Sequence, residues 1–595
     1  MYRQVTPISE IDNKLSAFYG LNYNEELKEG EFADTLNMTD AAFPCIRPRD
    51  ALLVSNALGD VCQGAFCKRK LATVIDKYLY YGGDYEHPIN SVAFTSGEKQ
   101  LISMGAYIIV FPDWYYYNTE KPSDKGYIER YFATGTGVST TFTLCKQDGT
   151  AYATPTVSAT APDNPADQAL WIDSSATPHT LMQWSDSAAM WVEIPTVYVK
   201  IASTGIGAGI KMYDSVEISG ITASGSPIQS QLQFLNGTMI VYDCGNDYIV
   251  VAGIIDQTAT ITDTVHCDMT IPSMDYVCES NNRLWGCKYG IVNNEPINEI
   301  YACKLGDFRN WRNFMGLSTD SYTVSLGSDG EFTGCVNYLG YPIFFKEGCI
   351  HKIYGTTPAN YQVQNTIARG VQKGSWRSLC IIDEKLYYKS TVDICVYDGS
   401  LPAKISDALG YNMLKNGVFG NIHGVLWMSF CDDNSKVDTY SYNPKSGVWH
   451  RHELPRFVFI SDDNDGYSGF MSEDAKLYSF IPPEMDEEPD ETVKWELKTG
   501  RISYGHRITS QNDALRLLKC EIRMRIEKYA SVKVYAEYDD SGVFEKAKEF
   551  HCSKLNTYVL PVFIHKCDHV RLKIMGSGYT TIFSISRIYT EGANR

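Results

Sequence analysis

Several features that mark enzymes, membrane proteins and nucleic-acid-binding proteins are missing from this sequence. Nowhere do about 18 apolar residues follow one another, so no membrane-spanning helix is predicted. The motifs GxSxG, HExxH, the P-loop and CxxC do not occur. Positive charge is scarce, because 53 Lys and Arg residues stand against 71 Asp and Glu residues, a net charge of −18. We therefore predict no enzymatic activity, no cofactor and no tight binding to DNA phosphates.

The 17 cysteines form neither a disulfide pattern nor a metal-binding pattern. Their number is odd, and residues such as Cys335, Cys349 and Cys380 sit singly in apolar runs. Cys62 and Cys67 have no second pair at zinc-finger spacing. We expect buried, reduced thiols and no bound metal. Because the N-terminus lacks the apolar core of a signal peptide, we also expect the protein to be made and assembled in a cytoplasm.

What the sequence does contain is a repeated aromatic hairpin. Tyr (41 residues) and Gly (46 residues) are abundant, while long stretches of helix-forming residues at helical spacing are missing. The recurring unit is a short apolar alternation, a Gly, Asn or Asp turn, and a second alternation ending in aromatic residues. The units are 77–81 with 107–111, 282–286 with 299–303, 335–339 with 342–346, 385–389 with 394–398, 425–429 with 439–443, and 467–471 with 476–480.

The spacing of these units predicts a β-propeller. They recur about every 40 to 55 residues, the length of a four-stranded blade. Segment 440–449 is similar to a kelch-type hairpin, in which a Gly permits the positive φ of the turn and the following Trp packs between neighbouring sheets. One copy alone would also fit an isolated hairpin with a core Trp, but repetition of the unit argues against that. The predicted fold class is therefore all-β.

Two changes in composition divide the chain. Between residues 123 and 271 it is rich in Thr, Ser and Ala, yet 196–201 and 215–219 still alternate as strands, which predicts an inserted β-rich domain. The Pro- and acid-rich run 481–491 predicts a linker, and strands beyond it suggest a C-terminal β-sandwich. The predicted units are an N-terminal segment with the first blades (1–122), the inserted domain (123–271), the remaining blades (272–481), and the linker with the C-terminal domain (482–595).

Three groups of segments, one near each end of the chain and one in its middle, carry a resemblance to one protein family. The most specific group is the middle one, formed by Met274–Val277, Asn282-Arg-Leu-Trp-Gly286, Gly306-Asp-Phe-Arg-Asn-Trp311 and Tyr341–Gly348. The full set is 20–24, 30–38 and 43–49; 274–277, 282–286, 306–311 and 341–348; and 568–578 with 582–585. In these segments the chain resembles the β-propeller portal-distal proteins of tailed bacteriophages, a family of packaged-DNA stabilisation proteins, tail nozzles and head-tail connectors.

The resemblance implies a non-catalytic virion protein that forms a homo-oligomeric ring in the head-tail or tail-nozzle conduit and retains and channels genomic DNA. Implied partners are further copies of the chain, neighbouring portal, adaptor or tail proteins, and DNA that passes through the lumen without specific binding. An acidic wall suits this passage because it repels phosphates. The implied location is the virion tail or neck, after assembly in the cytoplasm of the host bacterium.

Six residues are singled out as structural residues of the blades and their cores. They are Trp285, Asp307, Trp311, Phe345, Trp427 and Trp449. Asp307 is expected to fold its side chain onto its own backbone in an Asx-turn, and Trp311 to cover a blade.

Other candidate sites carry less weight. His565, Cys567 and His569 would share one face of an alternating strand, as metal ligands do, but the apolar pattern ends there and we prefer a solvated turn. The acidic run 461–467 fails the register of a calcium loop, and 327–330 contains only part of a sialidase aspartate box. Two other functions stay open: a receptor-binding propeller whose exposed Tyr and Trp stack on host glycans, and, ranked lower, a glycosidase with paired carboxylates.

Overall fold

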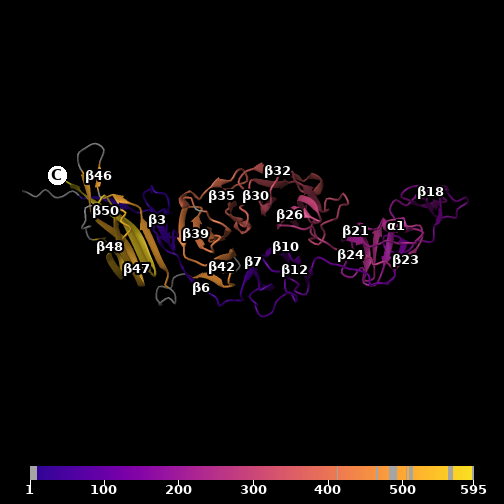
Figure 1. Ribbon diagram of the computed structural model, residues 1–595, viewed down its shortest axis with the longest axis horizontal. Coiled ribbons are helices and arrows are strands. Elements are labelled where there is room, and N and C mark those ends of the chain that lie inside the picture. The colour runs from indigo at the N-terminus through magenta and orange to yellow at the C-terminus, as the bar shows by residue number, and fades with distance from the viewer. Residues whose placement is uncertain are drawn as a thin grey trace, which may run out of the picture.

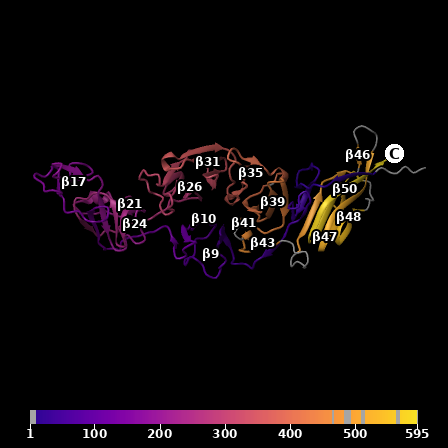
Figure 2. The ribbon, with the colours of Figure 1, turned by 180° about the vertical axis from the view of Figure 1, so that it is seen from behind.

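The computed structural model of the protein describes residues 10–411, 413–463, 467–481, 492–503, 505–507, 514–560 and 567–592. Three β-rich units lie in a line: a sandwich built from both ends of the chain, a central propeller, and an inserted domain on the far side (Figure 1). The view from behind shows the same order (Figure 2). The predicted fold class, an all-β propeller with an inserted β-domain and a C-terminal sandwich, is confirmed.

Seven small antiparallel sheets form the propeller in the described part of the chain, and we name them blades A to G. Blade A contains β7 (Cys62–Lys68), β8 (Lys70–Ile75) and β9 (Tyr78–Tyr81), and blade B contains β10 (Gln100–Met104), β11 (Tyr107–Phe111), β12 (Tyr115–Asn118) and β13 (Lys125–Tyr127). Blade C contains β25 (Tyr276–Ser280), β26 (Arg283–Val292), β27 (Glu295–Ala302) and β28 (Tyr322–Ser325). Blade D contains β29 (Phe332–Tyr338), β30 (Tyr341–Lys346), β31 (Cys349–Tyr354) and β32 (Gln362–Ile367).

The last three blades complete the circle. Blade E contains β33 (Cys380–Ile382), β34 (Lys385–Lys389), β35 (Ile394–Tyr397) and β36 (Ala403–Lys404), and blade F contains β37 (Val418–Ile422), β38 (Val425–Cys431), β39 (Val437–Asn443) and β40 (Val448–His452). Blade G contains β41 (Phe457–Asp463), β42 (Tyr467–Ser472) and β43 (Leu477–Ile481). Its fourth strand is β6 (Ala51–Val54), which comes from the N-terminal part of the chain and pairs with β43. Blade G is therefore built from two segments that lie far apart in the sequence.

Local turn chemistry explains the hairpins inside the blades. In blade C, Asn281 (φ 53°) and Asn282 (φ 58°) connect β25 to β26, and Asn293 (φ 51°) and Asn294 (φ 66°) connect β26 to β27. Two consecutive residues with positive φ form the tight turn whose twist matches antiparallel strands, and Asn tolerates that conformation. The Asn residues thus fix the register of this blade.

Seven apolar clusters hold neighbouring blades together, one at each junction around the circle. Trp285 of blade C and Phe344 of blade D belong to one cluster, and Phe457 of blade G and Ile422 of blade F belong to another. The last junction joins Met471 of blade G to Ile75 of blade A. Since each blade is too small to bury both of its faces alone, closure of the circle supplies every blade with two neighbours.

The inserted domain follows blade B and precedes blade C. Its seven-stranded sheet has the order β23 (Ala259–Ile261), β14 (Thr140–Cys145), β19 (Tyr198–Ala202), β22 (Tyr248–Ala252), β21 (Gly237–Gly245), β20 (Ser215–Ser219) and β24 (His266–Asp268). A smaller sheet contains β15 (Thr156–Ser158), β16 (Leu170–Asp173), β17 (Thr180–Ser185) and β18 (Met190–Glu193), and one short helix, α1, spans Gln229–Gln233. Ile172 and Leu181 of the small sheet pack into the same core as Val199 and Ile249 of the large one.

The C-terminal sandwich also contains strands from the N-terminal segment. Its C-terminal strands are β44 (Lys494–Thr499), β45 (Ile502–Ser503), β46 (Gly505–Arg507), β47 (Ala514–Tyr538), β48 (Glu545–Leu560), β49 (His569–Ser577) and β50 (Thr580–Gly592). The N-terminal strand β1 (Glu10–Leu15) pairs with β50, and β3 (Glu31–Leu36) pairs with β44. The two ends of the chain therefore share one core, in which Phe18 and Phe32 pack with residues such as Trp495 and Ile522.

Strand pairing attaches the sandwich to the propeller. The short strand β2 (Gly20–Leu21) lies between β3 and β40 of blade F, so that one sheet runs from the propeller into the sandwich. Gly20 is required at this contact, because its φ is +71° and a Cβ atom there would lie 2.4 Å from the carbonyl oxygen of Trp449. Arg451 of blade F also binds Asp34 of β3 through two hydrogen bonds of 3.1 and 2.7 Å.

Two details differ from the sequence analysis. Segments 77–81 and 107–111, taken there as one unit, are β9 and β11 of different blades. Strand β13 lies within the predicted insertion 123–271, yet it pairs with β12 and completes blade B. The insertion therefore starts after Tyr127.

Candidate functional site

Five of the six singled-out residues, the aromatic ones, lie at junctions between blades. Trp285 and Trp311 are buried, Phe345 is buried between blades D and E, and Trp449 is buried between blades E and F. Trp427 lies between blades F and G, where its ring is 4.5 Å from that of His452. Trp449 packs against Tyr442 of the same hairpin at 4.7 Å. All five aromatic rings therefore contribute to packing between sheets.

Asp307 and Trp311 lie in the loop between β27 and β28. Asp307 Oδ1 accepts a hydrogen bond from the backbone N–H of Arg309 (3.1 Å), which is the geometry of an Asx-turn. Trp311 Nε1 donates to the carbonyl of Phe308 (2.8 Å), and its ring meets Trp114 of blade B edge-on at 5.7 Å. This loop therefore packs across the junction between blades B and C, where the inserted domain leaves the propeller.

The same loop anchors the inserted domain through Asn310. Its Oδ1 accepts a hydrogen bond from the backbone N–H of Ser215 (2.9 Å), and its Nδ2 donates to Asp214 Oδ1 (3.2 Å). Asp214 is buried, and burial raises the pKa of its carboxyl group, while the charge of Arg309 3.7 Å away acts in the opposite direction. Arg309 Nη2 also donates to the carbonyl of Gly209 (3.1 Å). The sequence analysis treated 306–311 as a blade element and missed this anchoring role.

We expect Asn310→Ala to loosen the inserted domain without unfolding the propeller. The substitution leaves the N–H of Ser215 and an oxygen of Asp214 without their partner, and each unsatisfied buried group costs about 1–3 kcal/mol. Limited proteolysis should then cut the connections at 128–139 and 269–275 at least several times faster. Arg312→Ala is the matched control, because its ion pair with Glu217 (2.7 Å) is solvent-exposed and worth no more than about 1 kcal/mol. Equal cleavage of both variants would contradict the anchor.

The axis of the propeller encloses a cavity of about 670 Å³. All seven innermost strands contribute to its wall, and the side chains are mostly apolar or uncharged, including Phe66, Ile102, Val277, Val336 and Phe419. The volume falls in the range of small-molecule sites. A cavity of this volume is only about 9 Å across. This is less than the width of the major groove of duplex DNA alone, which is about 12 Å. A single propeller therefore cannot carry a duplex along its own axis.

A second cavity of about 640 Å³, which we call the cavity mouth, lies near the start of the innermost strands of blades B, C and D and shares Gln100 and Trp376 with the axial cavity. Each carboxylate in its lining has a cationic partner: Glu98 pairs with Arg377 (3.3 Å), Asp275 with Lys288 (2.6 Å) and Glu331 with Lys373 (2.5 Å). Trp376, Tyr276 and Tyr289 also line it, and Trp376 Nε1 donates to Glu98 Oε2 (3.1 Å). This mouth thus combines aromatic rings with paired charges, a lining that suits an uncharged polar ligand.

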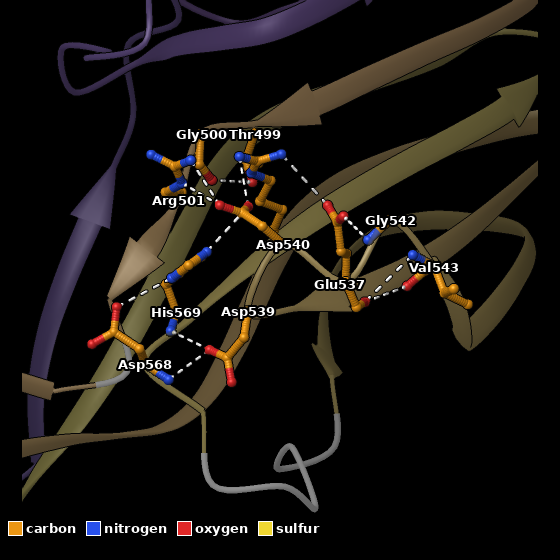
Figure 3. Close-up of polar contacts among 12 residues, drawn as sticks. Thr499, Gly500, Arg501, Glu537, Asp539, Asp540, Gly542, Val543, Asp568 and His569 are labelled. Carbon is orange, nitrogen blue, oxygen red and sulfur yellow. Dashed lines mark hydrogen bonds and ion pairs between the residues drawn. The ribbon is translucent and has the colours of Figure 1, made fainter.

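A polar cluster at one end of the sandwich contains part of the segment considered above as a metal site (Figure 3). Asp540, in the turn between β47 and β48, binds Arg501 at 2.7 Å and Arg571 at 2.6 Å. The hydrogen bond from Arg501, with the charges around it, lowers the pKa of Asp540 to about 2. His569 Nδ1 lies 3.2 Å from Asp568, and its Nε2 lies 3.1 Å from Asp540 as an ion pair without hydrogen-bond alignment. Burial opposes protonation, yet both carboxylates raise the pKa of His569.

These contacts tie the turns of the sandwich together. The charges of Arg501, Arg571 and His569 are balanced by neighbouring carboxylates, so the cluster is a structural ion-pair network. Among the residues that the structure describes, no group of His, Cys, Asp and Glu side chains is arranged to hold a metal ion. His565 and residues 464–466 of the acidic run lie outside the described residues. Within the described ranges, no helix is long and apolar enough to cross a membrane.

Comparison with known proteins gives structural likeness alone. No protein-family model matches the chain, and no curated protein matches it in sequence. An exo-β-1,3-galactanase from Phanerochaete chrysosporium is 8% identical, with 52% of this chain and 94% of that chain covered and a TM-score of 0.18. The extracellular domain of a hybrid two-component system from B. thetaiotaomicron is 9% identical (90% and 82% covered, TM-score 0.20), and the endosialidase of phage phi92 is 10% identical (93% and 88% covered, TM-score 0.18). The fold described above rests on the sheet topology.

Proposed function

We propose that the protein is a structural virion protein of a tailed bacteriophage, which forms a homo-oligomeric ring in the head-tail or tail-nozzle conduit. The observation that carries the proposal is the resemblance of the three groups of segments to that family. In the fold the first and last groups meet inside the sandwich, where Ile46 and Ile582 exchange two backbone hydrogen bonds (2.9 and 3.2 Å), and Asn310 of the middle group anchors the inserted domain. Its partners are further copies of the chain and neighbouring portal, adaptor or tail proteins.

Charge and cavity size define how such a ring works. The net charge of −18 repels the phosphates of DNA and so favours sliding over binding. Because the axial cavity excludes a duplex, the genome passes through a lumen between copies. The three domains lie in a line, so each copy has separate surfaces for its neighbours (Figure 1). The protein retains the packaged genome and then guides it out by shape and repulsion, without catalysis. We place it in the tail or neck of the virion, assembled in the cytoplasm of the host.

Gold-labelled antibodies against the protein, applied to purified virions, should test this location. We expect label at the tail vertex of each particle and nowhere else, in a constant number of copies per virion. Label over the capsid faces, or a protein present in infected cells but missing from virions, would contradict the proposal.

The cavity mouth favours a second candidate, a tail propeller that binds host glycans. The observation that favours this candidate is that Trp376, Tyr276 and Tyr289 line the cavity beside paired charges. On an array of host polysaccharides this candidate predicts binding that Trp376→Ala abolishes, whereas a conduit protein binds none. A glycosidase, the third candidate, would release reducing sugars from the same polysaccharides.

A further inference from the structure

One sheet of the sandwich has two open edges among the strands that the structure describes. Its order is β1, β50, the first half of β47 and the second half of β48, where Cys520 to Ile526 of β47 lie opposite 553–560 of β48. Among the described strands, β1 pairs with β50 alone and β48 pairs with β47 alone. An open strand edge presents backbone N–H and C=O groups that can bind a further strand.

The two halves of β48 protect their edge differently. Residues 545–551 are mostly charged, and Lys546 pairs with Glu549 (2.5 Å) within this half. Such charges are the usual protection of an edge strand. Residues 555–560 contain no charged side chain, and Leu555 (39%) and Val559 (43%) are exposed on their outer face. One half of the strand is therefore guarded and the other half is apolar.

One backbone group of this apolar half, the Val559 carbonyl, has a side-chain partner. Lys548, from the guarded half, donates from Nζ to this carbonyl (3.2 Å), so a strand added at this edge would replace the lysine. In an antiparallel strand every second residue directs its N–H and C=O to the same side. A strand added along 555–560 would therefore bond to every second residue of this half.

The opposite edge of the sheet, β1, matches this half in length and in its apolar side. It is six residues long, as is 555–560. Ile11 lies opposite Tyr589, which belongs to the sandwich core, yet Ile11 is 39% exposed. On β48, Tyr558 lies opposite the core residue Ile522 and packs against the same core. The core thus reaches both edges, through Tyr558 of β48 and through Leu15 of β1, which alternation places on the same face as Ile11.

From these edges we propose that β1 of one copy pairs with residues 555–560 of β48 of the next copy, which makes the sandwich sheet continuous around the ring. The inference rests on the proposed ring function and specifies which strands form the contact between neighbouring copies. The sheet has four antiparallel strands, so β1 and β48 run in opposite directions. Rotation about an axis parallel to the strands leaves their directions unchanged. The β1 strand of the rotated copy therefore runs antiparallel to β48 of the first copy, and repeated rotation by the same angle closes the ring. Pairing places Ile11 beside Tyr558 and extends the core across the contact.

The mass of the full-length chain, measured by light scattering after size-exclusion chromatography, tests this contact. We expect the wild type to form a closed oligomer, and Ile11→Lys and Val559→Lys each to reduce the oligomer fraction at least tenfold at the same concentration. Val559→Pro, which disfavours the addition of a strand at this edge without adding charge, should do the same. Ile367→Lys in blade D and Val543→Lys in the turn after β47 are the matched controls, because both residues are exposed away from the edges, and they should assemble like the wild type.

Mixing the two lysine variants gives the sharpest outcome. Each retains one intact edge, so a one-to-one mixture should form dimers of one copy of each variant and nothing larger. Dimers of a single variant, or rings of either variant, would overturn the β1–β48 contact while leaving the ring intact as a proposal. A wild type that stays monomeric at every concentration would overturn both. Should a variant fail to fold, hydrogen exchange on the wild type decides: amides of 11–15 and 555–560 must gain at least tenfold protection in the oligomer.

Discussion

Replacing Leu52 with alanine should lower the free energy of unfolding of the propeller by about 2–5 kcal/mol, the usual cost of removing a buried Leu side chain. Leu52 is only 8% exposed and packs with Trp427, Phe457 and Phe470 at the junction of blades F and G. It stands on β6, the strand that closes the circle of blades by pairing with β43. Loss of its side chain therefore weakens the last blade and the closure together.

Leu53→Ala provides the control from the adjacent residue of the same strand. Leu53 is 61% exposed, and surface substitutions of this kind change stability by less than about 0.5 kcal/mol. Unfolding in urea, followed by tryptophan fluorescence, compares the two variants. Equal midpoints for both would show that β6 contributes no burial to the closure.

Acidification should destabilise the protein between about pH 6.5 and pH 4, because three histidines are buried in their neutral form. Burial lowers the pKa of His351 to about 4, with the charge of Lys346 adding to the effect, and it lowers the pKa of His450 to about 4 as well. Burial also lowers the pKa of His452 well below its usual range. The unfolded chain, whose histidines have the ordinary pKa, binds more protons throughout this window, so stability falls as the pH falls. His351 accounts for a loss of about 3 kcal/mol at pH 4, and His450 and His452 add to the loss in the same direction.

His351→Gln separates this effect from general acid sensitivity. His351 Nε2 lies 2.9 Å from the Ser328 hydroxyl, a contact that a glutamine amide can retain. We expect the variant to lose less stability than the wild type between pH 7 and pH 4.5, measured by urea unfolding at each pH. His87→Gln is the control, since the His87 side chain is 80% exposed, and it should leave the pH dependence unchanged. A His351→Gln variant with the full wild-type pH dependence would contradict the prediction.

The blades were predictable because their information is local. In segment 440–449 the alternation, the turn and Trp449 all lie within ten residues, and the structure shows β39 and β40 paired there. Segments 335–339 and 342–346 likewise became the adjacent strands β29 and β30. Alternation and turn residues determine such hairpins without reference to the rest of the chain.

Closure of the propeller and composition of the sandwich were not predictable in this way. Strand β6 reads Ala-Leu-Leu-Val, without alternation, and its neighbours Ser55 and Leu477 are hydrogen-bonded although 422 residues separate them. The pairing of β1 and β3 with C-terminal strands is equally non-local. At the candidate site, the pattern indicated the Asx-turn of Asp307, but the role of Asn310 depends on the position of Ser215 in another domain. Contacts of this kind leave no periodic signal in a single sequence.

The origin of β6 near the start of the chain has a consequence for synthesis. A ribosome adds about 5–20 residues per second, so β6 leaves it roughly 20 to 90 s before β43, its partner, is translated. During that interval one apolar face of blade A lacks its neighbour, blade G, and the nascent chain holds an unpaired strand. Chaperones that cover exposed apolar segments are expected to accompany this polypeptide until translation ends, and a host depleted of them should accumulate it as aggregates.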